Sequence, residues 1–114
     1  MNELIKKLRK FASDRDWEQF HSPKNLSMAL AVEAAEILEL FQWLTEEQSR
    51  NIDQDTFNKV KQEIGDVQIY LARLADQLGF SPLEAAKEKL KENADKYPPE
   101  KAKGRAKKYT ELDK

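Results

Sequence analysis

The sequence contains no cysteine and a single histidine, His21. Without cysteine, the chain forms no disulfide, has no catalytic thiol and binds no zinc through thiolates. With one histidine, it has no metal site built from several imidazoles. Oxygen atoms are therefore the ligands that this chain offers to a metal ion.

Glycine, proline and long hydrophobic runs are also scarce. The chain has three glycines and four prolines among 114 residues, and no segment alternates apolar and polar residues in a way that predicts a strand. No window approaches the ~18 apolar residues of a membrane-spanning helix. The first ten residues, MNELIKKLRK, intersperse charges where a signal peptide has an unbroken apolar core. We therefore expect an all-α, cytoplasmic protein with no membrane partner.

Charge of both signs is abundant. Charged residues make up 36% of the sequence and hydrophobic residues 39%, yet the formal net charge is only -1. A nearly neutral chain has no general attraction to nucleic acid or to a membrane surface, so an electrostatic function has to come from local clusters. The length favours one domain, small enough for a partner subunit to add to its core.

Apolar residues at helical spacing predict a first helix over residues 3 to 13. We interpret this basic amphipathic helix as packing on the domain, although such helices also bind membrane surfaces. The periodicity then breaks, and Pro23 disfavours helix at the residue before it, so residues 14 to 24 are predicted to form an irregular loop. Asn25 is the expected N-cap of a long helix over residues 26 to 44.

A third helix is predicted after a connection over residues 50 to 54. Thr45 is expected to cap one extra turn before that connection, and Asp53 or Asp55 to cap the third helix itself. Gly79 is expected to end it. Its apolar residues alternate steps of three and four, as in the seam of a helical bundle: Phe57, Val60, Ile64, Val67, Leu71, Leu74 and Leu78.

The fourth helix is predicted to begin with Ser81 as N-cap and Pro82 at its first position, and to run to about Lys96. The prolines of YPPE end it, because proline lacks the amide hydrogen that a helix needs. We expect a small antiparallel bundle of four main helices over residues 1 to 97, followed by a basic, flexible tail over residues 98 to 114.

An acid interrupts the apolar stripe of the second helix. In LAVEAAEILELFQW, Glu33 occupies the stripe position between Leu30 and Ile37. Glu36 lies three residues further along, so both carboxylates lie on one side of the helix.

The third helix repeats this spacing with Glu63 and Asp66 in EIGD. If the two helices pack antiparallel through their stripes, four carboxylates meet, and four like charges in a partly desolvated site are unfavourable without a cation. Ligands that are all oxygen favour magnesium, with manganese as a substitute, over zinc. Magnesium often takes further ligands from substrate phosphates. Each pair alone is equally compatible with a solvated helix face.

Other residues are candidates for binding a phosphorylated ligand. Lys89, Asn93 and Lys96 share a face of the fourth helix and suit a triphosphate, but an exposed helix with glutamate–lysine pairs explains them too. Trp17 and Trp43 suit stacking on a nucleobase, against the alternative of core or interface tryptophans. Similar alternatives, capping or core packing, stay open for His21, Lys24, Asn25 and Tyr70.

Four blocks of the sequence together resemble a known family. They are RDWEQFHSPKNLSMALAVEAAEILELFQW, EIGDVQIYLARLAD, KENADKYP and KKYTEL, and they look like the dCTP pyrophosphatase branch of the MazG-like all-α nucleoside triphosphate pyrophosphohydrolases. The resemblance covers nearly the whole chain. One departure is that Leu8 and Arg9 stand where some members have a histidine, so the base preference is not carried over.

The resemblance implies hydrolysis of a nucleoside triphosphate to the monophosphate and pyrophosphate. We expect dCTP or a modified dCTP as the substrate, and a broader set of noncanonical nucleotides stays open. The resemblance further implies magnesium bound by Glu33, Glu36, Glu63 and Asp66, and we choose Glu36 as the catalytic base. It also implies a dimer or a dimer of dimers. Our predicted substrate-binding residues are Trp17, His21, Lys24, Asn25, Trp43, Tyr70, Lys89, Asn93 and Lys96.

Two other functions are compatible with parts of the sequence. A helical interaction module could use the same acids and the basic tail to bind a protein, without any metal. Binding of single-stranded nucleic acid through Trp17, Trp43 and the tail fits the stacking of bases on aromatic rings, but four carboxylates would repel the backbone. We therefore expect no nucleic-acid partner.

Overall fold

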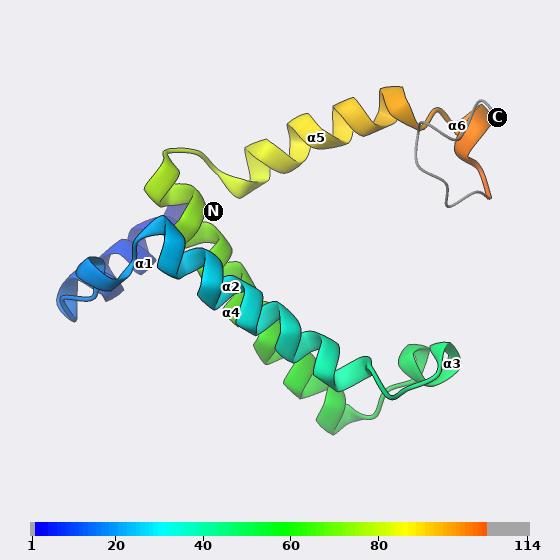
Figure 1. Cartoon of the computed structure of the whole chain (residues 1–114), viewed down its shortest axis with the longest axis horizontal. Coiled ribbons are helices and arrows are strands. Elements are labelled where there is room, and N and C mark those ends of the chain that lie inside the picture. Colours follow the sequence, from blue (N-terminus) through cyan, green and yellow to red (C-terminus); the bar gives the residue numbers. More distant parts are fainter. Residues whose placement is uncertain (1, 105–114) are drawn as a thin grey trace. The chain divides into compact units, whose positions relative to one another are not determined.

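The computed structural model describes residues 2–104. These residues form six α-helices, one 3-10 helix and no strand, which confirms the all-α class with four long helices. No helix among them is both long and apolar enough to cross a membrane. The elements are α1 (Asn2–Asp14), η1 (Glu18–Phe20), α2 (Pro23–Phe41), α3 (Glu46–Arg50), α4 (Gln54–Leu78), α5 (Pro82–Lys96) and α6 (Pro99–Ala102), shown in Figure 1.

The chain divides into two compact units between Ser81 and Pro82. In the first unit, α2 and α4 lie side by side and run in opposite directions, and α1 contacts α4 (Figure 1). This antiparallel pair is the arrangement under which the sequence predicts that the two acidic pairs meet. The second unit contains α5 and α6. The proposed division at residue 97 stays a prediction.

Helix α2 begins earlier and ends earlier than predicted. Its N-cap is Ser22, whose hydroxyl accepts a hydrogen bond from the backbone N–H of Asn25 at 3.2 Å. Pro23 starts the helix, because a proline at the first position gives up no helical hydrogen bond. The Asn25 side chain donates to the carbonyl of Phe20 at 3.1 Å, so the prediction that Asn25 is the cap was wrong. The helix ends at Phe41 instead of residue 44.

The remaining helix ends follow the predictions where the structure describes a cap. Thr45 and Gln48 form a capping box at the start of α3, with two reciprocal hydrogen bonds of 3.0 and 3.1 Å. Asp53 caps α4 by accepting from the N–H of Thr56 at 2.7 Å. Gly79 ends α4 with φ 83°, a left-handed conformation that glycine adopts without strain.

The predicted tail contains a short helix. Helix α6 follows Pro98, which is extended, and Pro99 occupies its first turn. Residues 105–114, the rest of the predicted flexible tail, lie outside the described residues.

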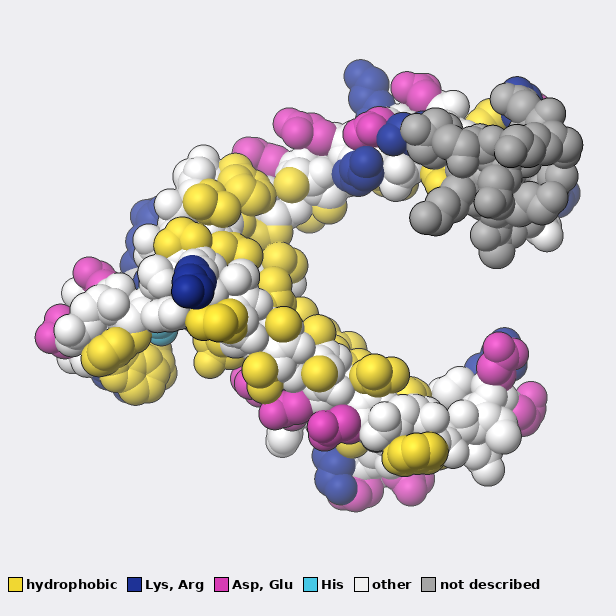
Figure 2. All heavy atoms as spheres, in the orientation of Figure 1, with side chains coloured by type: hydrophobic (Ala, Val, Ile, Leu, Met, Phe, Trp, Pro, Cys, Tyr) yellow, Lys and Arg dark blue, Asp and Glu magenta, His cyan; other side chains and the backbone are white. Residues whose placement is uncertain are grey.

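The buried core of the described residues is small. Leu26, Ala12, Ala72 and Ala75 are the buried hydrophobic residues, so close approach of small side chains accounts for much of the packing. Figure 2 shows hydrophobic side chains gathered over α2 and α4, with acidic side chains along one edge. Seven large apolar side chains of the α2–α4 region are 50% to 87% exposed: Met28, Val32, Leu38, Trp43, Phe57, Ile64 and Leu78.

Candidate functional site

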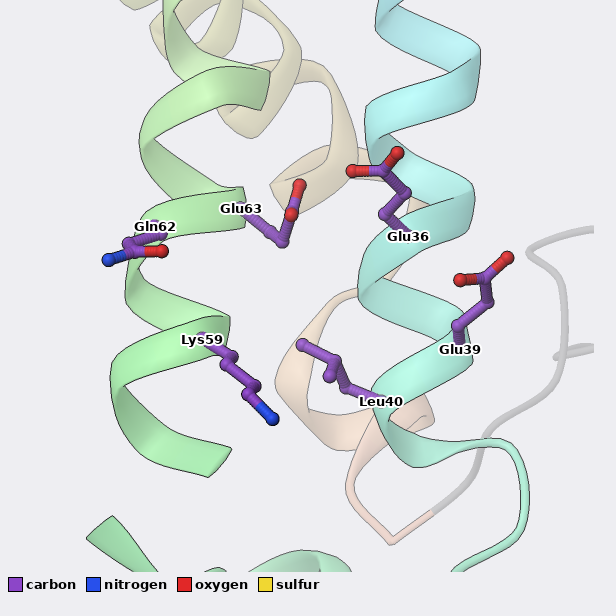
Figure 3. Close-up of a pocket in the computed structure, with 6 residues that line it drawn as sticks. All are labelled: Glu36, Glu39, Leu40, Lys59, Gln62 and Glu63. Carbon is purple, nitrogen blue, oxygen red and sulfur yellow. The ribbon is translucent and has the colours of Figure 1, made fainter. Parts of the chain in front are cut away.

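Three glutamates from the two antiparallel helices form an acidic cluster. Glu33 and Glu36 come from α2 and Glu63 from α4, and one carboxylate oxygen of each lies within 4.8 Å of the others. Figure 3 shows Glu36 and Glu63 pointing toward one another across the space between the helices. The side chains meet because a spacing of three residues keeps both α2 acids on the face that packs on α4.

The electrostatics of this cluster are unfavourable for three ionised carboxylates. The hydrogen bond with Glu33, then burial and the repulsion of Glu36, raise the pKa of Glu63 to about 7. For Glu33 the hydrogen bond with Glu63 lowers the pKa, but burial and the charges of Glu36 and Asp66 outweigh it, and the net shift is upward. A hydrogen bond between two carboxyl groups requires a proton on one of them, so without a cation we expect Glu33 and Glu63 to share a proton.

The cluster fits a divalent cation. Glu33 and Glu63 each bury a carboxylate oxygen that no donor among the described residues satisfies. Buried anionic oxygens without donors are stabilised by a metal ion, which takes the place of the shared proton. Because all three ligands are oxygens, the donor set suits magnesium or manganese.

Asp66 does not belong to this group of three. It lies one turn after Glu63 on α4 and lines a neighbouring pocket, although its charge still raises the pKa of Glu33. The structure therefore brings three of the four predicted metal ligands together and places the fourth at the boundary of a second pocket.

A hollow adjoins the cluster on the side away from Asp66. Its lining combines acidic residues with one lysine, and Figure 3 shows the amine of Lys59 pointing into the space between the helices. Lys59 also forms an ion pair with Asp55 at 3.2 Å. The residues around the hollow are Glu36, Glu39, Leu40, Lys59, Gln62 and Glu63.

The second pocket is mainly apolar and aromatic. Trp17 is held there because its backbone N–H donates to the carbonyl of Ala12 at 2.9 Å. Its ring packs edge-on against Phe11, with centroids 5.7 Å apart, and against His21, with centroids 6.4 Å apart. Trp17 is 44% exposed, which leaves ring surface for a ligand. The full lining of this aromatic pocket is Leu8, Phe11, Ala12, Trp17, His21, Asp66, Ile69, Tyr70 and Arg73.

The aromatic pocket contains a cation that the sequence analysis missed. Arg73 is 4% exposed, and its Nη2 lies 3.3 Å from Nδ1 of His21. Burial, and then the charge of Arg73, lower the pKa of His21. The spacing of Arg73 and Asp76, which form an ion pair at 3.7 Å, is the signal that could have indicated a buried charge on this face of α4.

The predicted substrate residues fall into three groups, two of them in the first unit. Trp17, His21 and Tyr70 meet in the aromatic pocket. Trp43 is 87% exposed just beyond the end of α2, and Lys24 and Asn25 are exposed in its first turn; none of these three lines either pocket.

Lys89, Asn93 and Lys96 belong to α5 in the second unit. There Lys89 and Lys96 both pair with Glu92, at 3.3 and 2.7 Å. Within this unit the described interactions of the two lysines are those expected for an exposed helix with paired charges.

Comparison with known proteins shows similarity over most of the chain. The profile of the MazG-like family matches residues 28–112. Proteins named dCTP pyrophosphatase 1 are 40% identical in Mus musculus and 39% identical in Homo sapiens, each over 113 residues and 96% of this chain. The chain spans 66% of the length of both relatives.

A solved structure is similar as well. The crystal structure of a pyrophosphatase from Archaeoglobus fulgidus matches with a TM-score of 0.81 and 40% identity, over 86% of this chain and 92% of that chain. The family match contains all three glutamates of the acidic cluster and Asp66, whereas Trp17 and His21 precede it.

Proposed function

Because the chain belongs to the MazG-like family, we propose that it is a nucleoside triphosphate pyrophosphohydrolase that converts dCTP, or a modified dCTP, to the monophosphate and pyrophosphate. The observation that carries this proposal is the acidic cluster of Glu33, Glu36 and Glu63 with an aromatic pocket beside it. Curated relatives named dCTP pyrophosphatase 1 support the choice of base and of the bond that is hydrolysed.

Glu33, Glu36, Glu63 and Asp66 would hold magnesium, with manganese as a substitute. When bound, such an ion neutralises charge on the phosphate chain and lowers the pKa of a coordinated water. Three of these carboxylates are already gathered, and Asp66, one turn further along α4, would supply the fourth ligand. Glu36 is the proposed general base. Glu36 and Glu63 both belong to the cluster and line the adjoining hollow, but the pKa of Glu63 is raised to about 7, which makes Glu63 the less available carboxylate.

The aromatic pocket would hold the pyrimidine base. Trp17 and Tyr70 supply ring surface and His21 a polar edge, which is the combination that small-molecule pockets use for fit and orientation. Asp66, a proposed metal ligand, lines the same pocket, which supports placing the phosphates of a base held there near the acidic cluster. We keep Trp43, Lys24, Asn25, Lys89, Asn93 and Lys96 as further proposed contacts to the substrate.

We also propose that the protein works as a homo-oligomer, either a dimer or a dimer of dimers. The exposed apolar side chains of α2 and α4 support this, because a monomer in water rarely exposes so many large apolar groups together. Assembly through these helices would allow residues from a second copy to complete each site.

Incubation of the purified protein with magnesium and a panel of deoxynucleoside and nucleoside triphosphates tests the activity. We expect pyrophosphate release, fastest with dCTP or a modified dCTP, and loss of turnover in excess EDTA. Release of orthophosphate would contradict the proposed bond cleavage, and no release from any triphosphate would contradict the enzymatic function.

A calorimetric titration separates the enzyme from a helical interaction module. The enzyme should bind magnesium, and more tightly with a nonhydrolysable nucleotide present, whereas a module without a metal site should give no heat of binding. Substitution of Glu33 or Glu63 by glutamine should weaken magnesium binding in the first case only.

A further inference from the structure

The aromatic pocket contains a buried charge to which the proposed reaction assigns no role. The side chain of Arg73 is only 5% exposed. A buried arginine is costly unless its charge and its hydrogen-bond donors have partners. Its Nε nevertheless has no hydrogen-bond partner among the described residues. This arrangement calls for an explanation beyond helix packing.

The carboxylate nearest to Arg73 is shared with another arginine. Arg73 Nη1 lies 3.7 Å from Oδ2 of Asp76, which is an ion pair too long for a strong hydrogen bond. Arg9 of α1 donates to the same carboxylate from Nε at 2.8 Å and from Nη2 at 2.5 Å. The hydrogen bonds of Arg9, together with its charge, hold the pKa of Asp76 below its ordinary value. Asp76 is therefore held in its ionised form and pairs with Nη1 of Arg73, which leaves Nη2 to contact His21.

One of these donors determines the state of His21. Arg73 Nη2 lies 3.3 Å from Nδ1 of His21. A guanidinium stays protonated and has donors only, so Nδ1 has to be the acceptor of this contact. A neutral imidazole that accepts at Nδ1 carries its hydrogen at Nε2. Burial and then the charge of Arg73 lower the pKa of His21, which favours this neutral form.

We propose that Arg73 is a positioning residue: it fixes His21 as an Nε2–H donor at the edge of the aromatic pocket, and the pocket thereby selects the hydrogen-bond-acceptor edge of a flat ring. A carbonyl oxygen or an unprotonated ring nitrogen of a pyrimidine has this chemistry. The identity of the ring rests on the proposed function, whereas the tautomer of His21 does not.

The surroundings of His21 make this selection effective. His21 lines the pocket together with Trp17 and Tyr70, and its ring is only partly buried. Since Nδ1 faces Arg73, Nε2 is the ring nitrogen left for a ligand. If a ligand presents a hydrogen-bond donor to Nε2–H of His21, both donors lose their hydrogen bonds to water and gain none in this mainly apolar pocket. A ligand with a donor edge is therefore rejected.

Nitrogen NMR of the free protein tests the tautomer directly. His21 is the single histidine, so its two ring nitrogens are observed without interference from other imidazoles. We expect the Nε2–H tautomer throughout the neutral range. A predominant Nδ1–H tautomer in the unsubstituted protein would overturn the proposal, whether or not the protein hydrolyses nucleotides.

The variant Arg73→Met removes the donors and keeps the length of the side chain. We expect both His21 tautomers to be populated, the pKa of His21 to rise toward 6.5, and the KM for dCTP to rise by about threefold to tenfold, with kcat within about twofold. Arg73→Lys keeps a cation with donors only, and is expected to restore the tautomer and part of the affinity.

Arg15→Met is the matched control. Arg15 carries its charge 3.6 Å above the ring of Phe11, which lines the same pocket, and its own hydrogen bond goes to the carbonyl of Phe11. It should leave the His21 spectrum and the KM unchanged. If Arg73→Met folds and also leaves both unchanged, the proposal is wrong; if it does not fold, the spectrum of the unsubstituted protein and of Arg73→Lys decides.

A failure of the proposed function gives a different result. If no triphosphate is hydrolysed, the tautomer of His21 still tests the role of Arg73. The affinity for dCMP, measured by calorimetry, then replaces the KM. Tighter binding of dCMP by the unsubstituted protein than by Arg73→Met then supports the positioning role.

Discussion

Glu36 belongs to the acidic cluster and also lines the hollow beside it, as Glu63 does. Replacing Glu36 with glutamine removes a metal ligand and the proposed base while keeping the shape of the side chain. We expect Glu36→Gln to lower kcat by about 10²-fold or more. The metal-free protein should be equally or more stable, because the charge that repels Glu33 and Glu63 is gone.

Glu39→Gln is the control for this prediction. Glu39 lies one turn along α2 and lines the hollow, but it is outside the cluster of three, so its loss should reduce kcat far less. Pyrophosphate release and thermal unfolding in EDTA measure both effects. A clear loss of metal-free stability in Glu36→Gln would show that Glu36 has a structural partner.

The raised pKa of Glu63 predicts how the stability of the metal-free protein depends on pH. In the folded state Glu63 has a pKa of about 7, against 4.5 for the ordinary carboxyl. The folded state therefore binds more protons than the unfolded state between these values, and the free energy of unfolding should fall as the pH rises through this range. Above pH 7 this contribution should level off.

Thermal unfolding in EDTA between about pH 5 and about pH 8 measures this dependence. The same titration on Glu63→Gln isolates it, because His21, whose pKa is lowered, contributes with the opposite sign in both proteins. In a separate measurement without EDTA, magnesium at about 100 times its Kd should raise the free energy of unfolding by about 2.7 kcal/mol. Equal pH profiles for the two proteins would contradict the proton shared by Glu33 and Glu63.

At the scale of the helices, we expect the substitution of glycine by alanine to have opposite effects on stability at two positions of the α4 region. Gly79 ends α4 at φ 83°, where alanine is strained, so Gly79→Ala should cost about 1–2 kcal/mol. Gly65 lies inside α4 with no atom within 4 Å of an added Cβ, so Gly65→Ala should stabilise the helix by up to about 1 kcal/mol. Urea unfolding measures both free energies.

Gly65 lies between Glu63 and Asp66, which makes the second half of this prediction informative. If Gly65→Ala lowers stability or activity instead, another surface comes close to α4 at that point. A substrate or a second copy of the chain would then be the source of the close approach.

Helix boundaries show where sequence patterns suffice. Thr45 and Gly79 were predicted correctly as ends of helices, and Asp53 is one of the two caps predicted for α4, because caps depend on a few neighbouring residues. Asn25 was predicted incorrectly, since Ser22 with Pro23 and Asn25 are both plausible starts and only the hydrogen bonds distinguish them. The helical turn η1, within the predicted loop, left no periodic signal.

For the whole molecule, the exposed apolar side chains predict assembly. Light scattering should give two or four times the 13.3 kDa of one chain. Leu38 is 60% exposed on α2, and Leu38→Lys should shift the mass toward one chain, because a charge buried at an interface is costly. Gln42→Lys, which adds the same charge at an exposed polar position, should not. A single-chain mass for the unsubstituted protein would contradict the proposed oligomer.

The sequence by itself determined the all-α class, the four long helices and the two acidic pairs on facing helices, because these depend on periodicity and spacing along the chain. Glu33 stood out as an acid in an apolar stripe before any packing was known. Tertiary structure decided which acids meet: Glu63 faces the α2 pair, while Asp66 lies at the edge of the aromatic pocket. Only the tertiary structure shows that Arg73 contacts His21, which lies 52 residues away in the sequence. Contacts between distant segments depend on how the helices pack, and they leave no pattern in the local sequence.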